Sequence, residues 1–213
     1  ILSIKPQYWA IFAIIMIVDI VVAMVLTFLF HKTGFLTKTE EDEHVQEASE
    51  GLVQPTALAE SAEVVSPLAG QVKPLSQATD PVFSSGVMGQ GVVIEPSQGE
   101  LVSPVNGTVT VLFPTKHAVG IVSEEGVEML MHIGMDTVSL DGKGFESHIK
   151  QGDKVVVGQQ LISFDMDVIK EAGLVTETPV IITNQDDFQA DVEGNLPRDI
   201  KRGDVLMIAH RTK

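Results

Sequence analysis

Apolar residues are concentrated near the start of the chain, in a run that few polar side chains interrupt. From Tyr8 to Leu36 the polar residues are Asp19, Thr27, His31, Lys32 and Thr33. The stretch Ile11–Phe30 alone is long enough to cross the hydrocarbon core of a bilayer as a helix. The pattern predicts one transmembrane α-helix within residues 1–36, with residues 8–36 in the membrane. Because the chain opens with Ile1 rather than Met, we interpret it as the tail of a longer protein.

Residues 37–62 have the opposite character. Large apolar side chains are few, and acidic residues are frequent: Glu40, Glu41, Asp42, Glu43, Glu47, Glu50 and Glu60. Such a segment buries too little apolar surface to offset the entropy lost on ordering, and its like charges repel one another. The composition therefore predicts a flexible acidic linker over residues 37–62.

From residue 63 to the C-terminus the pattern changes again. Short runs of Val, Ile and Leu alternate with Gly, Pro and Asp about every eight to twelve residues, which is typical of β-strands joined by turns. Only Asp167–Ala172, which Gly173 follows, suggests a turn of helix. The sequence predicts an all-β domain over residues 63–213, large enough for one hydrophobic core.

Two short sequences recur within this predicted domain. Val65–Val72 (VSPLAGQV) is similar to Val102–Val109 (VSPVNGTV), and each predicts a strand, a tight turn and a second strand. Likewise, Lys150–Val155 (KQGDKV) is similar to Lys201–Val205 (KRGDV). The two pairs together indicate two related β units packed against each other.

Composition narrows the functional classes. The net charge of −15 argues against nucleic-acid binding, which needs a basic surface. The absence of cysteine excludes disulfides and thiolate metal sites from this chain and fits a cytosolic domain. The glycines at 86, 89 and 91 lack the spacing of a phosphate-binding loop. If the protein accepts a phosphoryl group, ATP is therefore not the expected donor.

His117 and His132 are the candidates for chemistry, because both lie in strand-like apolar runs. Imidazole can accept and release a labile group near neutral pH. A phosphoryl acceptor needs one ring nitrogen open to solvent, the other held by an acceptor, and donors for the anionic oxygens. Thr115 would share a strand face with His117 if the strand continued past Pro114. Two other interpretations stay open at this point: two unrelated buried histidines, or a metal-binding pair that has no clear third ligand.

Longer stretches carry a specific resemblance. The chain from residue 64 to about residue 188 resembles the glucose-type IIA domain of the bacterial sugar phosphotransferase system. The stretches that carry it are Ser66–Gly70, Asp80–Phe83, Gly89–Pro96, Pro114–Ala118, Met131–Val138 and Gly142–Phe145.

The resemblance implies a fold, a reaction and partners. The fold is an antiparallel β-sandwich built from a duplicated hybrid motif. His132 is the residue that the phosphocarrier HPr phosphorylates, His117 and Thr115 position and neutralise the phosphoryl group, and His132 passes it to a cysteine of a IIB domain. No cofactor or metal is implied. The implied docking residues are Asp80, Val82, Phe83, Phe113, Leu130 and Asp136.

The order of segments suggests the architecture of the whole protein. A transmembrane helix followed by a linker and a IIA domain resembles the B-C-A permeases for β-glucosides, sucrose and trehalose. In such a protein the absent IIC domain binds the sugar, and the IIA domain lies on the cytoplasmic side of the cell membrane. One alternative is a galactoside symporter with a IIA-like regulatory tail. Another is a biotinyl or lipoyl carrier, although Met166–Lys170 matches the modified-lysine hairpin poorly.

Overall fold

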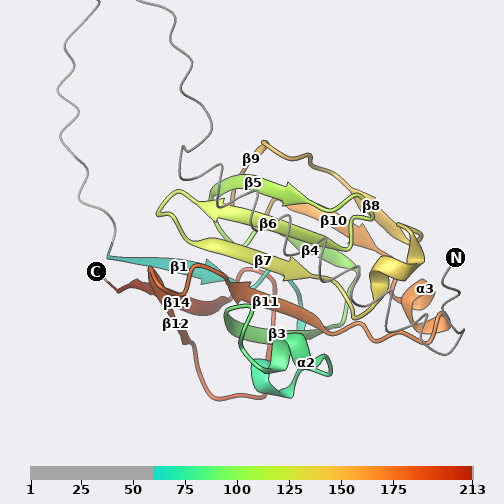
Figure 1. Cartoon of the computed structure of the whole chain (residues 1–213), viewed down its shortest axis with the longest axis horizontal. Coiled ribbons are helices and arrows are strands. Elements are labelled where there is room, and N and C mark those ends of the chain that lie inside the picture. The colour runs from blue at the N-terminus through green and yellow to red at the C-terminus, as the bar shows by residue number, and fades with distance from the viewer. Residues whose placement is uncertain (1–59, 213) are drawn as a thin grey trace, which may run out of the picture. The chain divides into compact units, whose positions relative to one another are not determined.

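The computed structural model describes residues 60–212 (Figure 1). The predicted transmembrane helix, and the predicted linker as far as residue 59, lie outside the described residues. Within residues 60–212, no helix has the length and apolar character needed to span a membrane. The first strand of the described residues begins at Ser61, so the last residues of the segment predicted as linker lie in a β-strand.

The described residues are almost entirely β-strands joined by short turns. The strands are β1 (Ser61–Val65), β2 (Gly70–Pro74), β3 (Gln90–Pro96), β4 (Glu100–Val102), β5 (Gly107–Leu112), β6 (Ala118–Ser123), β7 (Glu128–His132), β8 (Phe145–Ser147), β9 (Lys154–Val155), β10 (Gln160–Phe164), β11 (Thr178–Ile182), β12 (Phe188–Val192), β13 (Arg198–Ile200) and β14 (Val205–Arg211). The helices are α2 (Pro81–Ser84) and α3 (Met166–Glu171), with 3-10 turns η2 (Leu75–Gln77) and η3 (Thr137–Leu140).

The strands form one large sheet and two small ones. The eight-stranded sheet has the order β13-β2-β3-β11-β7-β6-β5-β9, and the three-stranded sheets have the orders β1-β14-β12 and β4-β10-β8. Every pair of neighbours runs antiparallel. The predicted all-β antiparallel class is therefore confirmed. Figure 1 shows β5, β6 and β7 side by side, with β11 and β3 continuing the sheet below them.

The first recurring sequence has the same local structure in both copies. The Ser66 hydroxyl donates to the Leu68 carbonyl over 2.7 Å, and the Ser103 hydroxyl donates to the Val105 carbonyl over 2.7 Å. Both serines are fully buried, and a buried hydroxyl without a partner would be costly. Serine at this position of each copy is therefore explained by the turn that it closes.

Two backbone hydrogen bonds also link the copies reciprocally. The Val65 N–H donates to the Pro104 carbonyl over 3.1 Å, and the Val102 N–H donates to the Pro67 carbonyl over 3.0 Å. Equivalent atoms of the two copies thus exchange roles, as a local two-fold relation requires. The sheet order has the same symmetry, since β2 and β3 stand on one side of the central pair β11 and β7, and β5 and β6 stand on the other.

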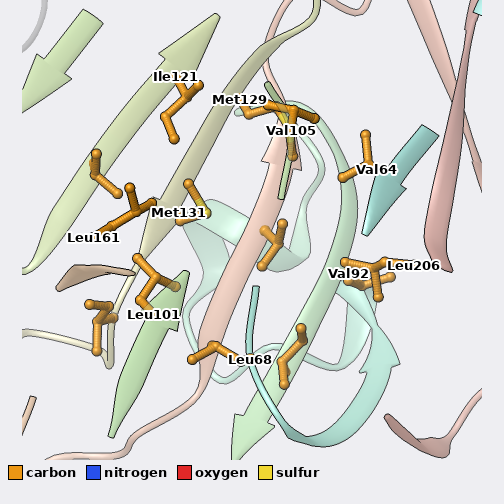
Figure 2. Packing of buried hydrophobic residues seen from close by; sticks show 14 of the residues in the cluster. Val64, Leu68, Val92, Leu101, Val105, Ile121, Met129, Met131, Leu161 and Leu206 are labelled. Carbon is orange, nitrogen blue, oxygen red and sulfur yellow. The ribbon is translucent and has the colours of Figure 1, made fainter. Parts of the chain in front are cut away.

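Both faces of the large sheet are covered at β11. Val180 and Ile182 belong to the main core. Figure 2 shows part of this core, including Met129 and Met131 of β7, Ile121 of β6, and Leu101, Leu161 and Leu206 of the small sheets. Ile181 points the other way, into a second cluster with Leu75, Ala78, Phe83, Val93 and Met135. Each apolar side chain that is fully buried contributes about 1.5–3 kcal/mol. The second cluster is what holds η2 and α2 on the outer face of the sheet.

The helical turn expected at Asp167–Ala172 is α3, which begins one residue earlier. The Asp165 carboxylate accepts hydrogen bonds from the backbone of Asp167 and Val168, and so caps the helix. Gly173 has φ +76° just beyond its end. The sequence did not predict α2, η2 or η3, which are too short for a helical period to be visible.

Candidate functional site: a histidine pair on the large sheet

His117 and His132 lie against each other. His132 is the last residue of β7, and it pairs across the ladder with Ala118, the first residue of β6. The Ile133 N–H donates to the His117 carbonyl over 2.7 Å, so the ladder continues one step beyond the strands. The ring centroids are 4.8 Å apart and the ring planes meet at 76°. The topology therefore brings together two histidines that stand fifteen positions apart in the sequence.

His117 does not lie in a strand, contrary to the expectation from the sequence. Residues 113–117 form the loop between β5 and β6, in which the Lys116 N–H donates to the Phe113 carbonyl over 2.8 Å. Pro114 occupies the second position of this turn, where its fixed φ is favourable, and Lys116 has φ +60°. The sequence did not predict this hairpin turn, because Pro114 was the only residue in the run that signalled a break in the strand.

The backbone of Gly134 fixes the tautomer of His132. His132 Nδ1 lies 2.7 Å from the Gly134 carbonyl oxygen. A carbonyl can only accept, so Nδ1 is the protonated nitrogen. In a neutral ring Nε2 then carries the lone pair. The contact therefore fixes which nitrogen of a neutral His132 can accept a hydrogen bond or a new bond.

Gly134 is required by the loop in which it lies. Its φ is +70°, and an added Cβ would stand 2.5 Å from Thr137 Cγ2 and 2.8 Å from the Val175 carbonyl oxygen. The next residue, Met135, donates its N–H to that same Val175 carbonyl over 3.1 Å. Glycine adopts this conformation without the cost that a side chain adds. In the sequence Gly134 stood out only as part of the Met131–Val138 stretch, and the bond to His132 was not predicted.

Thr115 contacts His117 directly. Thr115 Oγ1 and His117 Nδ1 are 2.5 Å apart, within the loop rather than along a strand. A hydroxyl can donate or accept in such a pair. When Thr115 donates, Nδ1 is the acceptor and the proton of His117 resides on Nε2. His117 then presents an N–H, whereas His132 presents a lone pair.

Two phenylalanine rings extend the pair into a row. The Phe83 ring centroid lies 5.4 Å from that of His132, and the Phe113 centroid lies 5.3 Å from that of His117. Both pairs are tilted, which is a favourable arrangement for aromatic rings. The apolar rings remove water from the outer sides of the two imidazoles.

Burial lowers the pKa of both histidines. Desolvation, followed by the effect of the neighbouring His132, lowers the pKa of His117 to about 4. Desolvation also lowers the pKa of His132, although its bond to Gly134 and the charges of Asp80 and Asp136 act in the opposite direction. Both rings are therefore neutral at neutral pH. A neutral His132 keeps the Nε2 lone pair available for reaction.

The six expected docking residues occupy different environments. Val82 is 54 % exposed, whereas Phe83 is 6 % exposed and belongs to the outer cluster. Leu130 is half-buried against that cluster, and Phe113 is half-buried beside His117. Asp80 caps α2 by accepting from the Val82 N–H over 2.7 Å, and Asp136 is exposed in the loop after Gly134.

One exposed apolar side chain in the segment after His132 was not predicted. Val138, in η3, is 53 % exposed, although its position inside the Met131–Val138 motif could have drawn attention to it. Residues 60–212 contain no cluster of three or more histidine or carboxylate side chains arranged to hold a metal ion. The histidine pair consequently offers proton-bearing and lone-pair nitrogens rather than a complete ligand set.

The fold and the site define a class: an antiparallel β domain that presents a neutral imidazole lone pair beside a second histidine. The family model described as phosphoenolpyruvate-dependent sugar phosphotransferase system, EIIA 1, matches residues 62–188, which is more than half of the chain. The chain belongs to this family. Its domain is a phosphoryl carrier of the sugar phosphotransferase system, and the resemblance found in the sequence is confirmed.

Similar proteins include both separate domains and parts of larger chains. The β-glucoside-specific EIIBCA component of Bacillus subtilis is 55 % identical over 141 residues, which are 66 % of this chain and 23 % of that protein. The glucose-specific EIIA component of Bacillus cereus is 48 % identical over 123 residues, 58 % of this chain and 74 % of that one. The solved structure of glucose permease IIA from Mycoplasma capricolum is 38 % identical, covers 70 % of this chain and 95 % of that chain, and has a TM-score of 0.63.

Proposed function

We propose that His132 accepts a phosphoryl group from phospho-HPr on Nε2 and passes it to a cysteine of a IIB domain, so that sugar uptake is coupled to sugar phosphorylation. The observation that carries the proposal is the 2.7 Å contact between His132 Nδ1 and the Gly134 carbonyl. It holds one nitrogen protonated and leaves the other as the nucleophile.

The transfer is balanced without an added acid or base. The Nε2 lone pair attacks phosphorus, the bond from phosphorus to the HPr histidine breaks, and that imidazole leaves with the electron pair. His132 keeps its proton on Nδ1, so the phosphorylated ring carries a positive charge, which the Gly134 carbonyl stabilises. In the second step a cysteine thiolate attacks the same phosphorus, and His132 returns to its neutral form.

His117 and Thr115 assist by binding the phosphoryl oxygens. With the Thr115 hydroxyl donating to Nδ1, His117 carries its N–H on Nε2, and its ring centroid lies 4.8 Å from that of His132. Its pKa of about 4 makes it a neutral donor in the unphosphorylated domain. The arriving phosphoryl dianion favours protonation of His117, so this residue neutralises charge only when the phosphoryl group is present.

Partners dock on the apolar surface beside the pair. Val82 and Val138 are exposed on the two segments that flank His132, with Phe113 at the far end of the ring row. An apolar contact of this kind tolerates more than one partner shape, which suits a domain that must receive from HPr and deliver to a IIB domain. Asp80 and Asp136 form the charged edge of this docking surface and face partners with basic side chains.

The whole protein is proposed to be a B-C-A sugar permease at the bacterial cell membrane. The EIIBCA relative from Bacillus subtilis supports this assignment, and so does the apolar sequence at 8–36. In this arrangement the predicted linker over residues 37–62 joins the IIA domain to the last helix of the IIC domain. The IIA domain then lies on the cytoplasmic side, where HPr is available.

Labelled phosphate transfer tests the roles of the histidines. The domain is incubated with phosphoenolpyruvate carrying labelled phosphate, enzyme I and HPr, and then with a IIB domain. His132→Ala should accept no label, and His117→Ala should accept label on His132 but transfer it slowly to the cysteine. His148→Ala is the matched control, because His148 contacts Ser163 and lies outside the pair.

Two outcomes would contradict the proposal. Labelling of His132→Ala on another histidine would show that the acceptor is misassigned. The second outcome concerns the full-length protein, in membranes that lack other IIA proteins. If deletion of the domain changed sugar symport but left sugar phosphorylation intact, the domain would be the regulatory tail of a symporter.

A further inference from the structure

A partly buried carboxylate, that of Glu177, is hydrogen-bonded to the residue just before Asp80. Glu177 precedes β11, and its side chain is only 13 % exposed. Its Oε2 atom accepts two hydrogen bonds from one residue, from the Thr79 N–H over 2.9 Å and from the Thr79 hydroxyl over 2.7 Å. Hydrogen bonds to an ionised acceptor are about twice as strong as neutral ones. Glu177 therefore holds Thr79 by both its backbone and its side chain.

The second oxygen of Glu177 is neutralised from the large sheet. Lys73 of β2 places Nζ 3.7 Å from Glu177 Oε1 and 2.7 Å from Glu95 Oε2 of β3. The hydrogen bond with Glu95 is the chief cause that raises the pKa of Lys73. The positive charge of Lys73 thus partly balances the Glu177 carboxylate that holds Thr79, although Glu95 is the closer partner of Lys73.

Thr79 stands at the start of the segment that packs on His132. The next residue, Asp80, caps α2, and the backbone N–H groups of Phe83 and Ser84 donate to its carbonyl over 3.2 Å and 2.9 Å. α2 contains only four residues, too few to be stable as an isolated helix. Its position must come from outside contacts, and Phe83 is the residue that it places against the His132 ring.

The segment that contains Glu177 also contacts the loop that follows His132. Two residues earlier, the Val175 carbonyl accepts from the Met135 N–H over 3.1 Å. Met135 follows Gly134, whose carbonyl holds His132 Nδ1. One short segment before β11 thus contacts the elements that carry two of the groups that touch the His132 ring: Gly134 through the Val175–Met135 hydrogen bond, and Phe83 through Glu177 and Thr79.

We propose that Glu177 is a positioning residue for His132, acting through Thr79 to fix α2 and with it Phe83 and Asp80 beside the imidazole. The consequence for phosphoryl transfer rests on the proposed function of His132, whereas the consequence for the position of α2 does not. Nothing in this role requires Glu177 to touch substrate or partner.

The test compares two substitutions at the same position. Glu177→Leu removes the acceptor, and Glu177→Gln keeps an amide oxygen that can accept from Thr79. Glu95→Gln is the matched control, since it removes the nearer partner of Lys73 without touching Thr79. The measurements are amide hydrogen exchange along α2, the pH titration of His132 by NMR, and kcat and KM for phosphoryl uptake from phospho-HPr.

In Glu177→Leu the amides of Val82 to Ser85 should exchange about tenfold faster, which is the size expected for losing hydrogen bonds to a charged acceptor. The His132 titration should shift, because Phe83 and Asp80 lose their fixed places. Phosphoryl uptake should lose several-fold in kcat with a smaller change in KM. Glu177→Gln should keep α2 exchange, the His132 titration and phosphoryl uptake close to those of the unchanged domain. Glu95→Gln should behave like the unchanged domain.

The outcomes separate the two proposals. If Glu177→Leu leaves both α2 exchange and the His132 titration unchanged, the positioning role is wrong. If these change while even the unchanged domain takes up no phosphoryl group, the proposed function fails and the positioning role stands. Should Glu177→Leu not fold, Thr79→Val removes only the hydroxyl bond, and the absence of any effect on α2 exchange or the His132 titration would equally refute the role.

Discussion

β7 and β11 are neighbours in the middle of the large sheet, equal in length, yet they differ in how they are covered. All five residues of β11 are buried, whereas those of β7 alternate between buried and half-buried. Ile181 of β11 pairs with Leu130 of β7 across the ladder. The two strands share a core on the inner face, so the difference arises entirely on the outer face.

The cover on that outer face ends beside His132. Phe83 packs with Ile181 in the outer cluster and also contacts the His132 ring, so it forms the edge of the cover. His132 is therefore desolvated on one side and reachable on the other. A ring placed at the boundary can be neutral and nucleophilic while a partner protein still reaches Nε2. A fully covered strand or a fully exposed one would give only one of these properties.

Removal of the Phe83 ring should expose the outer face of β11 to water, as the outer face of β7 already is in part. Phe83→Ala should destabilise the domain by about 3 kcal/mol, the lower end of the range for a buried phenylalanine. It should also raise the pKa of His132 toward its ordinary value, because water reaches the ring. Urea unfolding and NMR titration measure the two effects. Val82→Ala, an exposed neighbour in α2, should change stability by no more than about 0.5 kcal/mol, and an equal loss in both variants would contradict the account.

Acid should destabilise the folded domain, because His117 and His132 are desolvated and resist protonation. The folded pKa of His117 is about 4 against an ordinary value of 6.5, so the neutral ring is favoured in the folded domain. This contribution is fully present above pH 6.5 and is lost as the pH falls through 6.5 toward 4, to a total of about 3 kcal/mol. The lowered pKa of His132 acts in the same direction.

The pH effect is isolated by comparison with His117→Gln. Urea unfolding of both proteins between about pH 7.5 and pH 4 removes the contribution of carboxylates common to the two. The unchanged domain should lose more stability than the variant. Equal losses would show that His117 is not desolvated as described.

A comparison of substitutions at Gly134 and Gly152 separates the effect of backbone strain from the effect of a steric clash. Gly134→Ala should cost about 2 kcal/mol or more, because a positive φ is combined with contacts to Thr137 and Val175. Gly152 has φ +92° and no atom within 4 Å of an added Cβ, so Gly152→Ala should cost only about 1 kcal/mol. Thermal unfolding compares them. Only Gly134→Ala should also shift the His132 titration, and a shift in both would contradict the local role of Gly134.

The sequence predicted the β class because that class depends on local signals. Alternating apolar runs and turn residues indicate strands, and the duplicated Ser-Pro turns identify the two units that the reciprocal hydrogen bonds link. The residues alone left open whether His117 and His132 share a site, and only the resemblance of the surrounding motifs to the glucose-type IIA domain implied it. His117 was nevertheless assigned to a strand, because the conformation of Lys116 leaves no mark in the residue type.

The contacts that position His132 could not be predicted in the same way. Phe83 was expected on the docking surface, but its side chain is only 6 % exposed and belongs to the same cluster as Ile181, 98 residues later in the chain. Glu177 and Thr79 are equally distant in sequence, and neither belongs to a recognisable motif. Such partners are set by which segments the fold places together, and a single sequence does not report that.

The nitrogen of the His132 ring that carries the phosphoryl group can be identified by NMR. The domain is labelled with ¹⁵N in histidine, phosphorylated by phospho-HPr and studied by NMR experiments that correlate ring protons with both ring nitrogens. We expect a phosphorus–nitrogen bond at Nε2 of His132, with Nδ1 still protonated and bonded to the Gly134 carbonyl. A phosphoryl group on Nδ1 of His132, or on His117, would contradict it.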